Sequence, residues 1–350
     1  MTYEITRDYR SDTVTLPTET MRTAMARAEV GDDVYGEDPT VNRLQEEAAR
    51  RMGQEAGLFM ASGSMGNLVA ILTHAGRGDE AIAGIDSHTL LWEAGGMATL
   101  GGIFPHPLPT DEDGRLDADA VEAAVRTDNP HLARSRLLLL ENSYGSRGGF
   151  PLPASYFADM GAIAKRHNLR VHLDGARLFN TAVALECDPA SLTEHVDSVT
   201  FCLSKGLCAP VGSVLCGSSD FIHQARRQRK LLGGGMRQAG ILAAAGLVAL
   251  DEMVDRLVED HTHAFQLATG LAAVDGIVLD RDRVRTNIVL FELSPEVPLD
   301  AARFARKLAE DHSLLVDPQD DRLIRAVTHH GIEARHIEQF ISAAADILTG

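Results

Sequence analysis

Short apolar runs and amphipathic stretches alternate between residues 56 and 217. The apolar runs have the length of buried strands, and several stretches between them have the apolar spacing of helices. The strand-like runs are AGLFMA, EAIAGI, SRLLLLEN, LRVHLD, DSVTFCLS and GSVLCG, and the helical stretches include LVAILTHA and FADMGAIAKRH. This order is typical of βαβ units and predicts an α/β fold, with a mostly parallel sheet and helices on both faces. In such sheets ligands gather at the carboxyl ends of the strands.

A second region begins near residues 240–261, which are rich in alanine and are predicted to form one long buried helix that could bridge two domains. Beyond it, TNIVLFEL and RLIRAVT look like strands, while LDAARFARKLAEDH and ARHIEQFISAAADIL look like helices. We therefore predict a large domain over residues 1–250 and a smaller C-terminal α+β domain over residues 251–350.

Charge and apolar patterning exclude several classes of protein. The 33 basic and 50 acidic residues give a net charge of -17, which repels phosphate backbones and anionic membranes, so we expect no nucleic-acid or membrane partner. No apolar run is long enough to span a bilayer and the start MTYEITRDYR is not a signal peptide, so we expect a cytoplasmic protein. The cysteines form no CxxC pair, and we predict buried free thiols in preference to a disulfide or metal role for Cys187, Cys202, Cys208 and Cys216.

Two strand ends carry residues that suit an anionic, aldehyde-bearing ligand. SGSMGN at residues 62–67 lies between a predicted strand and helix, where small residues let backbone amides approach a phosphate. The same turn would also serve as a plain helix cap. Lys205 follows the run VTFCLS, and burial there would lower its pKa and make the amine nucleophilic. The alternative is a lysine that extends to the surface.

A third strand end carries Asp174, followed by Gly175 and by Arg177. Pyridoxal phosphate forms a Schiff base with lysine and needs a carboxylate that keeps its pyridine nitrogen protonated. Asp174 suits this task, and Gly175 leaves room for the ring. Arg177 offers a fork of donors for a substrate carboxylate or for the ring's phenolate oxygen. A structural ion pair between the aspartate and the arginine is the alternative.

Motifs along almost the whole chain resemble those of one family. In order they are RSDTVTLPT, GDDVYGEDPTVNRL, ASGSMGN, DSHTLLWEAGG, VHLDGARLFN, LSKGLCAPVGS, LLGGGMRQAGILAAAGL and RAVTHHGI. The chain resembles the low-specificity threonine aldolases of the β-eliminating lyase group, which are fold-type I enzymes dependent on pyridoxal 5'-phosphate. The resemblance implies a transferase-like fold and retro-aldol cleavage of L-β-hydroxy-α-amino acids to glycine and an aldehyde. Threonine, allo-threonine and aryl serines such as phenylserine are the expected substrates.

The resemblance also implies roles for individual residues. Lys205 would be the Schiff-base lysine and Asp174 the partner of the pyridinium. His88 would stack on the ring and is our first choice of catalytic base, with Tyr144 second. Tyr144 stands in ENSYG where the family often has a histidine, in ENTHN. The phosphate would be held by Gly63, Ser64 and Met65, and the substrate carboxylate by Ser11, Arg177 and Arg325.

The family usually forms homotetramers with active sites shared between subunits. By resemblance, Tyr35 would reach the substrate and Arg237 the cofactor of a neighbouring subunit. We expect no metal site, although the pairs His261/His263 and His329/His330 suggest ligands, because no carboxylate or cysteine set completes either. Two other readings stay open: a different reaction on the same cofactor, such as β-elimination or racemisation, and a non-catalytic binding protein that keeps the fold.

Overall fold

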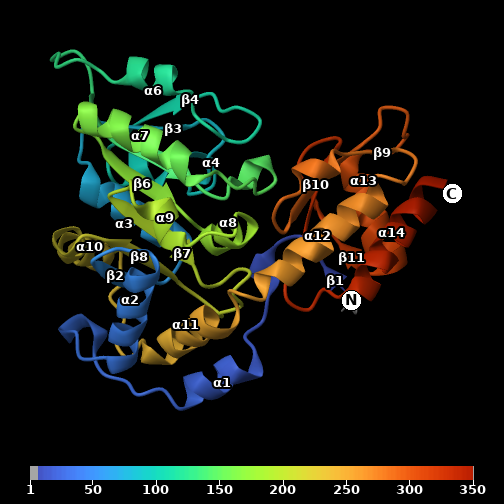
Figure 1. Ribbon diagram of the computed structural model, residues 1–350, viewed down its shortest axis with the longest axis horizontal. Coiled ribbons are helices and arrows are strands. Elements are labelled where there is room, and N and C mark those ends of the chain that lie inside the picture. The colour runs from blue at the N-terminus through green and yellow to red at the C-terminus, as the bar shows by residue number, and fades with distance from the viewer. Residues whose placement is uncertain (1–6, 350) are drawn as a thin grey trace.

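A seven-stranded sheet forms the centre of the larger part of the molecule (Figure 1). The computed structural model describes residues 7–349, so residues 1–6 of the polar start lie outside the described part. The strand order is β2-β8-β7-β6-β5-β3-β4, and all pairs are parallel except those that β8 makes with β2 and β7. The predicted mostly parallel sheet is confirmed. The strands are β2 (Ala56–Met60), β3 (Asp79–Gly84), β4 (Phe104–Leu108), β5 (Arg134–Glu141), β6 (Arg170–Asp174), β7 (Ser198–Cys202) and β8 (Ser213–Gly217).

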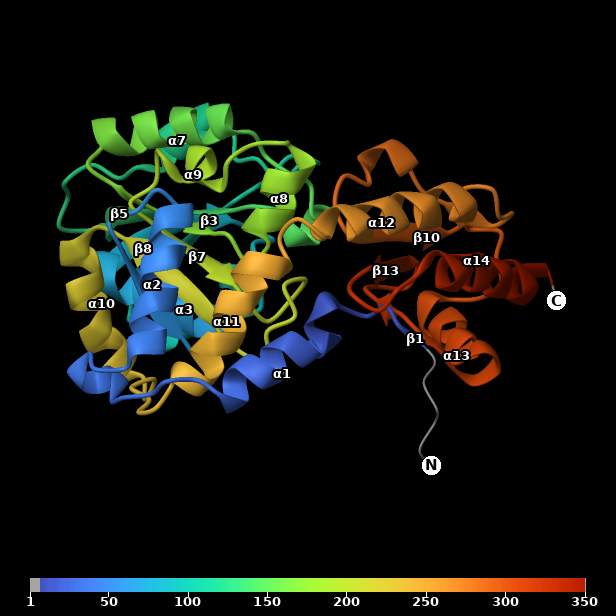
Figure 2. The ribbon, with the colours of Figure 1, turned by 60° about the horizontal axis from the view of Figure 1, so that its bottom comes forward.

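Helices cover both faces of this sheet because successive strand side chains point to opposite sides. On β2, Phe59 packs in a core with α2, α7 and α11, whereas Leu58 and Met60 pack with α3 and α10. Figure 2 shows α7 and α3 on opposite sides of the sheet. The helices are α1 (Glu19–Ala26), α2 (Pro39–Arg51), α3 (Gly63–His74), α4 (His88–Leu91), α5 (Gly96–Thr99), α6 (Ala118–Ala124), α7 (Ala154–Arg166), α8 (Leu178–Ala184), α9 (Pro189–Thr193), α10 (Ser219–Leu231) and α11 (Gly240–Glu252).

The C-terminal part is a smaller α+β unit with its own core. An antiparallel sheet of order β12-β13-β10-β9 packs with three helices, and β1 (Arg7–Asp8) pairs in parallel with β11 (Leu314–Leu315). Tyr9 is buried in this second core, so the N-terminal segment passes along the small unit before it enters the large one. The other elements are β9 (Ile277–Val278), β10 (Ile288–Leu293), β12 (Asp317–Pro318), β13 (Leu323–Val327), α12 (Leu257–Leu271), α13 (Ala301–His312) and α14 (Ala334–Thr349).

The prediction of one long helix over residues 240–261 is wrong. The chain forms α11 and α12, with a break at residues 253–256 that contains no glycine or proline. Met253 and Leu257 still pack in the large core, whereas Ala264 packs in the small one. The break therefore redirects the chain from one core to the other. The division into domains near residue 251 stays a prediction.

Two further expectations bear on the environment of the protein. Among residues 7–349 no helix combines the length and apolar character needed to cross a membrane. The compartment stays a prediction. All four cysteines are free thiols, as predicted, and three are buried, with Cys202 on β7 and Cys216 on β8, whereas Cys187 is only half-buried.

Candidate active site

The N-terminus of α3 presents free backbone amides at the carboxyl end of β2. Ser62 caps the helix, and its Oγ accepts a hydrogen bond of 3.2 Å from the amide of Met65. The amides of Gly63 and Ser64 occupy the first two helical positions, where no intrahelical acceptor exists. A Cβ at Gly63 would lie 2.8 Å from Cys202 Sγ, so only glycine fits there. The structure therefore leaves Gly63 and Ser64 for an anion, while the amide of Met65 is already bonded.

Asp174 ends β6 as a buried carboxylate with two donors. Its Oδ1 accepts from the amide of Ala176 at 3.0 Å, and its Oδ2 accepts from Asn67 Nδ2 at 2.8 Å. Only 2% of Asp174 is exposed. Gly175 has no space for a side chain, since a Cβ would lie 3.0 Å from the backbone oxygen of Thr200. The carboxylate is thus fixed at the strand end, and no cationic side chain among residues 7–349 bonds it directly.

Lys205 lies in the turn that follows β7 and is half-buried. Its backbone oxygen accepts hydrogen bonds from Thr15 Oγ1 and from the amide of Cys208, both at 2.9 Å. Among the described residues, its amine has no hydrogen-bond acceptor. The turn is therefore held by its backbone while the amine stays available for a ligand.

Arg177 is engaged by a buried carboxylate from the N-terminal segment. Its Nη2 and Nε donate to Asp12 at 2.6 and 2.8 Å, and Asn287 Nδ2 donates to the same carboxylate at 3.2 Å. Burial opposes ionisation, but Arg177 outweighs it and holds the pKa of Asp12 well below its usual range. The charges of Lys205 and Arg325 lower the pKa of Asp12 in the same direction.

Arg325 and Ser11 approach this cluster from the small unit and the N-terminal segment. Arg325 lies on β13 beside Asp317, with 3.6 Å between Nη1 and Oδ2. Burial and the nearby charge of Arg177 lower the pKa of Arg325. Ser11 caps the turn at Asp12–Val14, and its Oγ accepts from the amide of Thr13 at 3.2 Å. Arg325 is the less firmly paired of the two predicted clamp arginines.

His88 begins α4 and is held by two glutamates. Its Nδ1 lies 3.1 Å from Glu93 Oε1, and its backbone amide donates to Glu141 Oε2 at 2.8 Å. The hydrogen bond to Glu93 raises the pKa of His88, and burial raises the pKa of Glu93. Burial, followed by the charge of Asp174, raises the pKa of Glu141 to about 7. The imidazole therefore keeps Nε2 for the site.

Tyr144 has a different partner from the one its predicted role requires. Its hydroxyl donates to Asp86 Oδ1 at 2.9 Å, and Asp86 also pairs with Arg147 at 2.6 Å. A Cβ at Gly114 would lie 2.2 Å from the Tyr144 ring, so the ring is enclosed by backbone. Burial, with the charges of Glu141 and Asp86, raises the pKa of Tyr144 far above its usual value. This geometry argues against Tyr144 as a base.

Tyr35 and Arg237 are both exposed, and both are bonded to Asp32. Asp32 caps the turn that contains Tyr35 and accepts a hydrogen bond of 2.9 Å from Arg237 Nη1. Tyr35 is 75% exposed, and the Arg237 side chain is 54% exposed. Within one subunit neither residue is bonded to Lys205 or Asp174.

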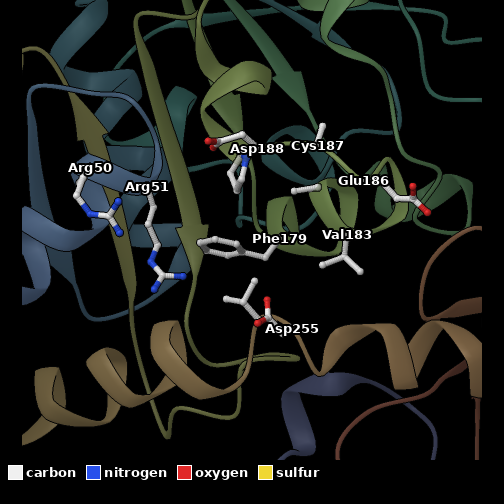
Figure 3. A pocket seen from close by; sticks show the side chains of 11 residues that line it. Arg50, Arg51, Phe179, Val183, Glu186, Cys187, Asp188 and Asp255 are labelled. Carbon is white, nitrogen blue, oxygen red and sulfur yellow. The ribbon is translucent and has the colours of Figure 1, made fainter.

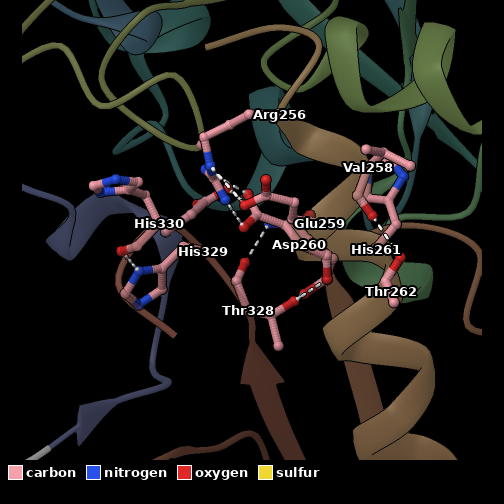
Figure 4. A network of polar contacts seen from close by, with 12 residues as sticks. Arg256, Val258, Glu259, Asp260, His261, Thr262, Thr328, His329 and His330 are labelled. Carbon is pink, nitrogen blue, oxygen red and sulfur yellow. Dashed lines mark hydrogen bonds and ion pairs between the residues drawn. The ribbon is translucent and has the colours of Figure 1, made fainter. Parts of the chain in front are cut away.

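The predicted histidine pairs do not assemble a metal site among residues 7–349. His329 bonds the backbone of Asp8, and His261 Nε2 lies 3.2 Å from Asn180 Nδ2, on the two sides of the Arg256–Asp260 ion pair (Figure 4). In this part of the chain the one group with metal-like spacing is His88, Glu93 and Asp174, whose ligand atoms lie within 4.8 Å of one another. Asn67 bridges both of its carboxylates, and the group belongs to the strand-end cluster.

A cavity of about 550 Å³ opens elsewhere, between α2, α8 and the connection from α11 to α12 (Figure 3). Arg50 and Arg51 line it, and both pair with Glu47, at 2.7 and 2.6 Å. None of the strand-end residues borders this cavity. We assign it no part in the chemistry of the site.

Four residues of the cluster were not predicted: Asp12, Asn67, Glu93 and Glu141. Each is hydrogen-bonded to a predicted residue, in most cases one far away in the sequence. Asn67, for example, bonds Asp174 across 107 positions. Asn67 gave the one usable signal. It is the polar residue in the otherwise apolar run MGNLVAIL, and such a residue is buried only with a partner.

The strand-end residues suit pyridoxal phosphate. The helix amides suit its phosphate, and the Lys205 amine, which has no acceptor among the described residues, suits its aldehyde. The buried carboxylate of Asp174 suits its pyridine nitrogen.

The fold supports the same class of enzyme. The chain resembles the Leishmania major threonine aldolase at a TM-score of 0.81, with 21% identity and coverage of 98% and 99% of the two chains. It also resembles Sphingomonas wittichii serine palmitoyltransferase at a TM-score of 0.75, with 18% identity and coverage of 97% and 86%. The fold is that of the fold-type I pyridoxal-phosphate enzymes.

Sequence comparison narrows this class to one family. Residues 8–294 match the family described as beta-eliminating lyase, and the chain belongs to this family. It is 48% identical over 340 residues to the Arabidopsis thaliana probable low-specificity L-threonine aldolase 2, covering 96% of each chain. It is 43% identical to the Escherichia coli K12 low specificity L-threonine aldolase, covering 95% of this chain and 96% of that one. The predicted resemblance is confirmed.

Proposed function

We propose that the protein cleaves L-β-hydroxy-α-amino acids to glycine and an aldehyde, with pyridoxal 5'-phosphate as cofactor. The observation that carries the proposal is the match to low-specificity L-threonine aldolases over almost the full length of both chains. The unpaired lysine amine, the buried carboxylate and the helix amides support it from the site. Threonine, allo-threonine and phenylserine are the substrates to test.

Each predicted cofactor contact has a residue ready for it. Gly63 and Ser64 would hold the phosphate by their amides, Lys205 would bind the aldehyde, and Asp174 would hold a proton at the pyridine nitrogen. When bound, the cofactor supplies a conjugated ring that accepts the electron pair released as a bond at the substrate Cα breaks. Asp174 is suited to its task because burial leaves it few other partners and Asn67 fixes its direction.

The substrate carboxylate would be bound between the large and small units. Arg325 has only a long ion pair with Asp317, so its donors are available for a carboxylate. Arg177 uses Nε and Nη2 on Asp12, which leaves Nη1 for the carboxylate or for the ring's phenolate oxygen. Ser11 would add a hydroxyl. Such a clamp would orient the bond between Cα and Cβ before it breaks.

His88 is the base that the geometry favours. Glu93 binds Nδ1 and so directs the lone pair of Nε2 into the site when the carboxylate is ionised. A histidine held in this way can take the proton of the substrate hydroxyl, directly or through water. Tyr144 donates to Asp86 and has a raised pKa, which makes it a support of the adjacent loop.

We also propose a homotetramer in which Tyr35 and Arg237 complete the site of a neighbouring subunit. Tyr35 is 75% exposed, its chain neighbour Val34 is 40% exposed, and the Arg237 side chain is 54% exposed. A single chain would leave this apolar area in water. A two-fold interface would cover it and bring the pair toward a neighbouring chain.

Product analysis tests the reaction. Purified protein supplied with pyridoxal phosphate should release equal amounts of glycine and aldehyde from at least one β-hydroxy amino acid. Pyruvate and ammonia would indicate β-elimination instead, and interconversion of enantiomers would indicate racemisation. The Lys205→Ala variant should lose turnover. Normal turnover in that variant would refute the assignment of the lysine.

A further inference from the structure

A continuous chain of hydrogen bonds, buried except at its last member, leads away from Asp174 between α3 and strands β6 and β7. Asp174 Oδ2 lies 2.8 Å from Asn67 Nδ2, and Asn67 Oδ1 lies 3.1 Å from His172 Nε2. His172 Nδ1 lies 2.9 Å from Ser198 Oγ, which lies 2.7 Å from His74 Nε2. Asn67, His172 and Ser198 are buried, and neither His172 nor Ser198 has a part in the proposed reaction.

The partners of Asn67 fix the direction of the first hydrogen bonds. Its Nδ2 faces two carboxylates, Asp174 at 2.8 Å and Glu93 at 2.8 Å, and so donates one hydrogen to each. Its Oδ1 therefore points the other way and needs a donor, which only His172 Nε2 supplies among the described residues. His172 must carry its hydrogen on Nε2.

The rest of the chain agrees with this direction. Burial lowers the pKa of His172 to about 3 and that of His74 to about 4, so both rings are neutral at pH 7. A neutral His172 with hydrogen on Nε2 has a lone pair on Nδ1, which accepts from the Ser198 hydroxyl. Ser198 then accepts from His74 Nε2. All donors in the chain point toward Asp174.

The chain is suited to hold groups in place and not to carry protons. Every proton path from His172 to Asp174 would cross the Asn67 amide, which does not gain and lose protons near neutral pH. What the chain does provide is orientation. Without a donor at Oδ1, the amide of Asn67 could turn and present its oxygen to two carboxylates.

We propose that His172 is a positioning residue: by holding Asn67, it orients both Asp174, the partner of the pyridine nitrogen, and Glu93, the partner of His88. This proposal rests on the proposed function, which assigns the roles of Asp174 and His88. Ser198 secures the His172 tautomer, and His74 closes the chain by stacking on Phe221, with 4.4 Å between ring centroids. His74 borders a second cavity, of about 680 Å³, at the opposite end of the strands.

Four variants of the full-length chain test this role. His172→Leu removes the donor to Asn67, and His172→Gln replaces it with an amide N–H. Ser198→Ala removes the hydroxyl that bonds Nδ1 and so no longer fixes the tautomer of the His172 ring. Val171→Ala is the matched control. Val171 is the neighbouring buried residue on β6, and its side chain packs in the core that contains α2, α7 and α11, away from Asn67. The dissociation constant for pyridoxal phosphate is measured by titration of the cofactor-free protein. Values of kcat and KM are measured for aldehyde release.

We expect His172→Leu to weaken cofactor binding and lower kcat by about tenfold each, as loss of an outer orienting partner commonly does, with little change in KM. His172→Gln should recover most of both, Ser198→Ala should show a smaller loss of the same kind, and Val171→Ala should resemble the parent. If His172→Leu does not fold, His172→Gln and Ser198→Ala decide by the same two measurements.

An unchanged cofactor affinity and kcat in folded His172→Leu, or equal losses in Val171→Ala, would overturn the proposal. The cofactor titration needs no substrate. If the parent protein releases no aldehyde from any hydroxy amino acid, the proposed function fails, while the order of cofactor affinities still tests the role of His172.

Discussion

Arg177 binds the fully buried Asp12 through two hydrogen bonds, at 2.6 and 2.8 Å, across 165 positions of sequence. The bond attaches the N-terminal segment to the strand end that carries Asp174. It also explains why Ser11 lies in the cluster, since Ser11 caps the turn that Asp12 begins. The N-terminal segment is thus part of the site's construction.

Loss of Asp12 should destabilise the protein and weaken substrate binding. Asp12→Ala leaves the Arg177 guanidinium buried without its partner, which typically costs about 3–5 kcal/mol in the free energy of unfolding. Urea denaturation measures this loss, and KM for the amino acid should rise because Arg177 is no longer held. Asp8→Ala is the control. Its exposed pair with Arg10 should contribute at most about 1 kcal/mol, so equal losses would contradict the prediction.

Substitutions of Tyr144 and of His88 should distinguish a residue that supports the loop from the catalytic base. Tyr144→Phe removes one hydrogen bond to Asp86, which retains Thr110 and Arg147, so it should cost about 1 kcal/mol of stability and leave kcat close to the parent value. His88→Gln removes the proposed base and should lower kcat by about 100-fold or more. Steady-state assays of aldehyde release distinguish the two. A large loss of kcat in Tyr144→Phe alone would return the base role to the phenol.

Glu93 should set the acidic limit of activity. Its hydrogen bond raises the pKa of His88, and the base works only when Nε2 is unprotonated. Activity is therefore lost as the pH falls through this raised pKa. Glu93→Gln removes the carboxylate charge, so the acidic limb of kcat/KM should move to lower pH. The control is Glu122→Gln, whose partner His167 is remote from the site. An acidic limb that stays in place would exclude His88 as the titrating base.

The strand-end residues could be predicted because the carboxyl ends of parallel strands meet at one edge of a sheet. Gly63, Asp174 and Lys205 were found in this way. The carboxylates that hold Arg177 and His88 could not be predicted, because Asp12 reaches Arg177 and Glu93 reaches His88 only after the chain has folded. Nothing in WEAGG or RSDTV distinguishes these carboxylates from surface ones.

Two features of the fold differ in how far the sequence could predict them. Residues 253–256 are compatible with a helix, yet the chain turns there because α11 and α12 pack in different cores. The antiparallel β8 had a signal in the sequence. Only ten residues, 203–212, connect it to β7, which is short for a parallel crossover.

Mixed oligomers should show whether Arg237 acts on its own subunit or on a neighbour. Arg237→Ala and Lys205→Ala chains are each expected to be poorly active alone. If Arg237 completes a neighbouring site, a mixed dimer contains one site with both an intact Lys205 and an intact Arg237. Random reassortment should then restore about a quarter of the sites. The measurement is aldehyde release after the two variants are unfolded and refolded together.

A second mixture provides the control for this experiment. Asp174 ends β6 and Lys205 follows the adjacent strand β7 of the same chain, so both belong to the same site. Lys205→Ala mixed with Asp174→Ala should therefore regain nothing, because every site lacks one of the two residues. Recovery with Arg237→Ala but not with Asp174→Ala would place Arg237 in the neighbour's site. No recovery in either mixture, with mixed oligomers verified by differential tags, would confine Arg237 to its own subunit.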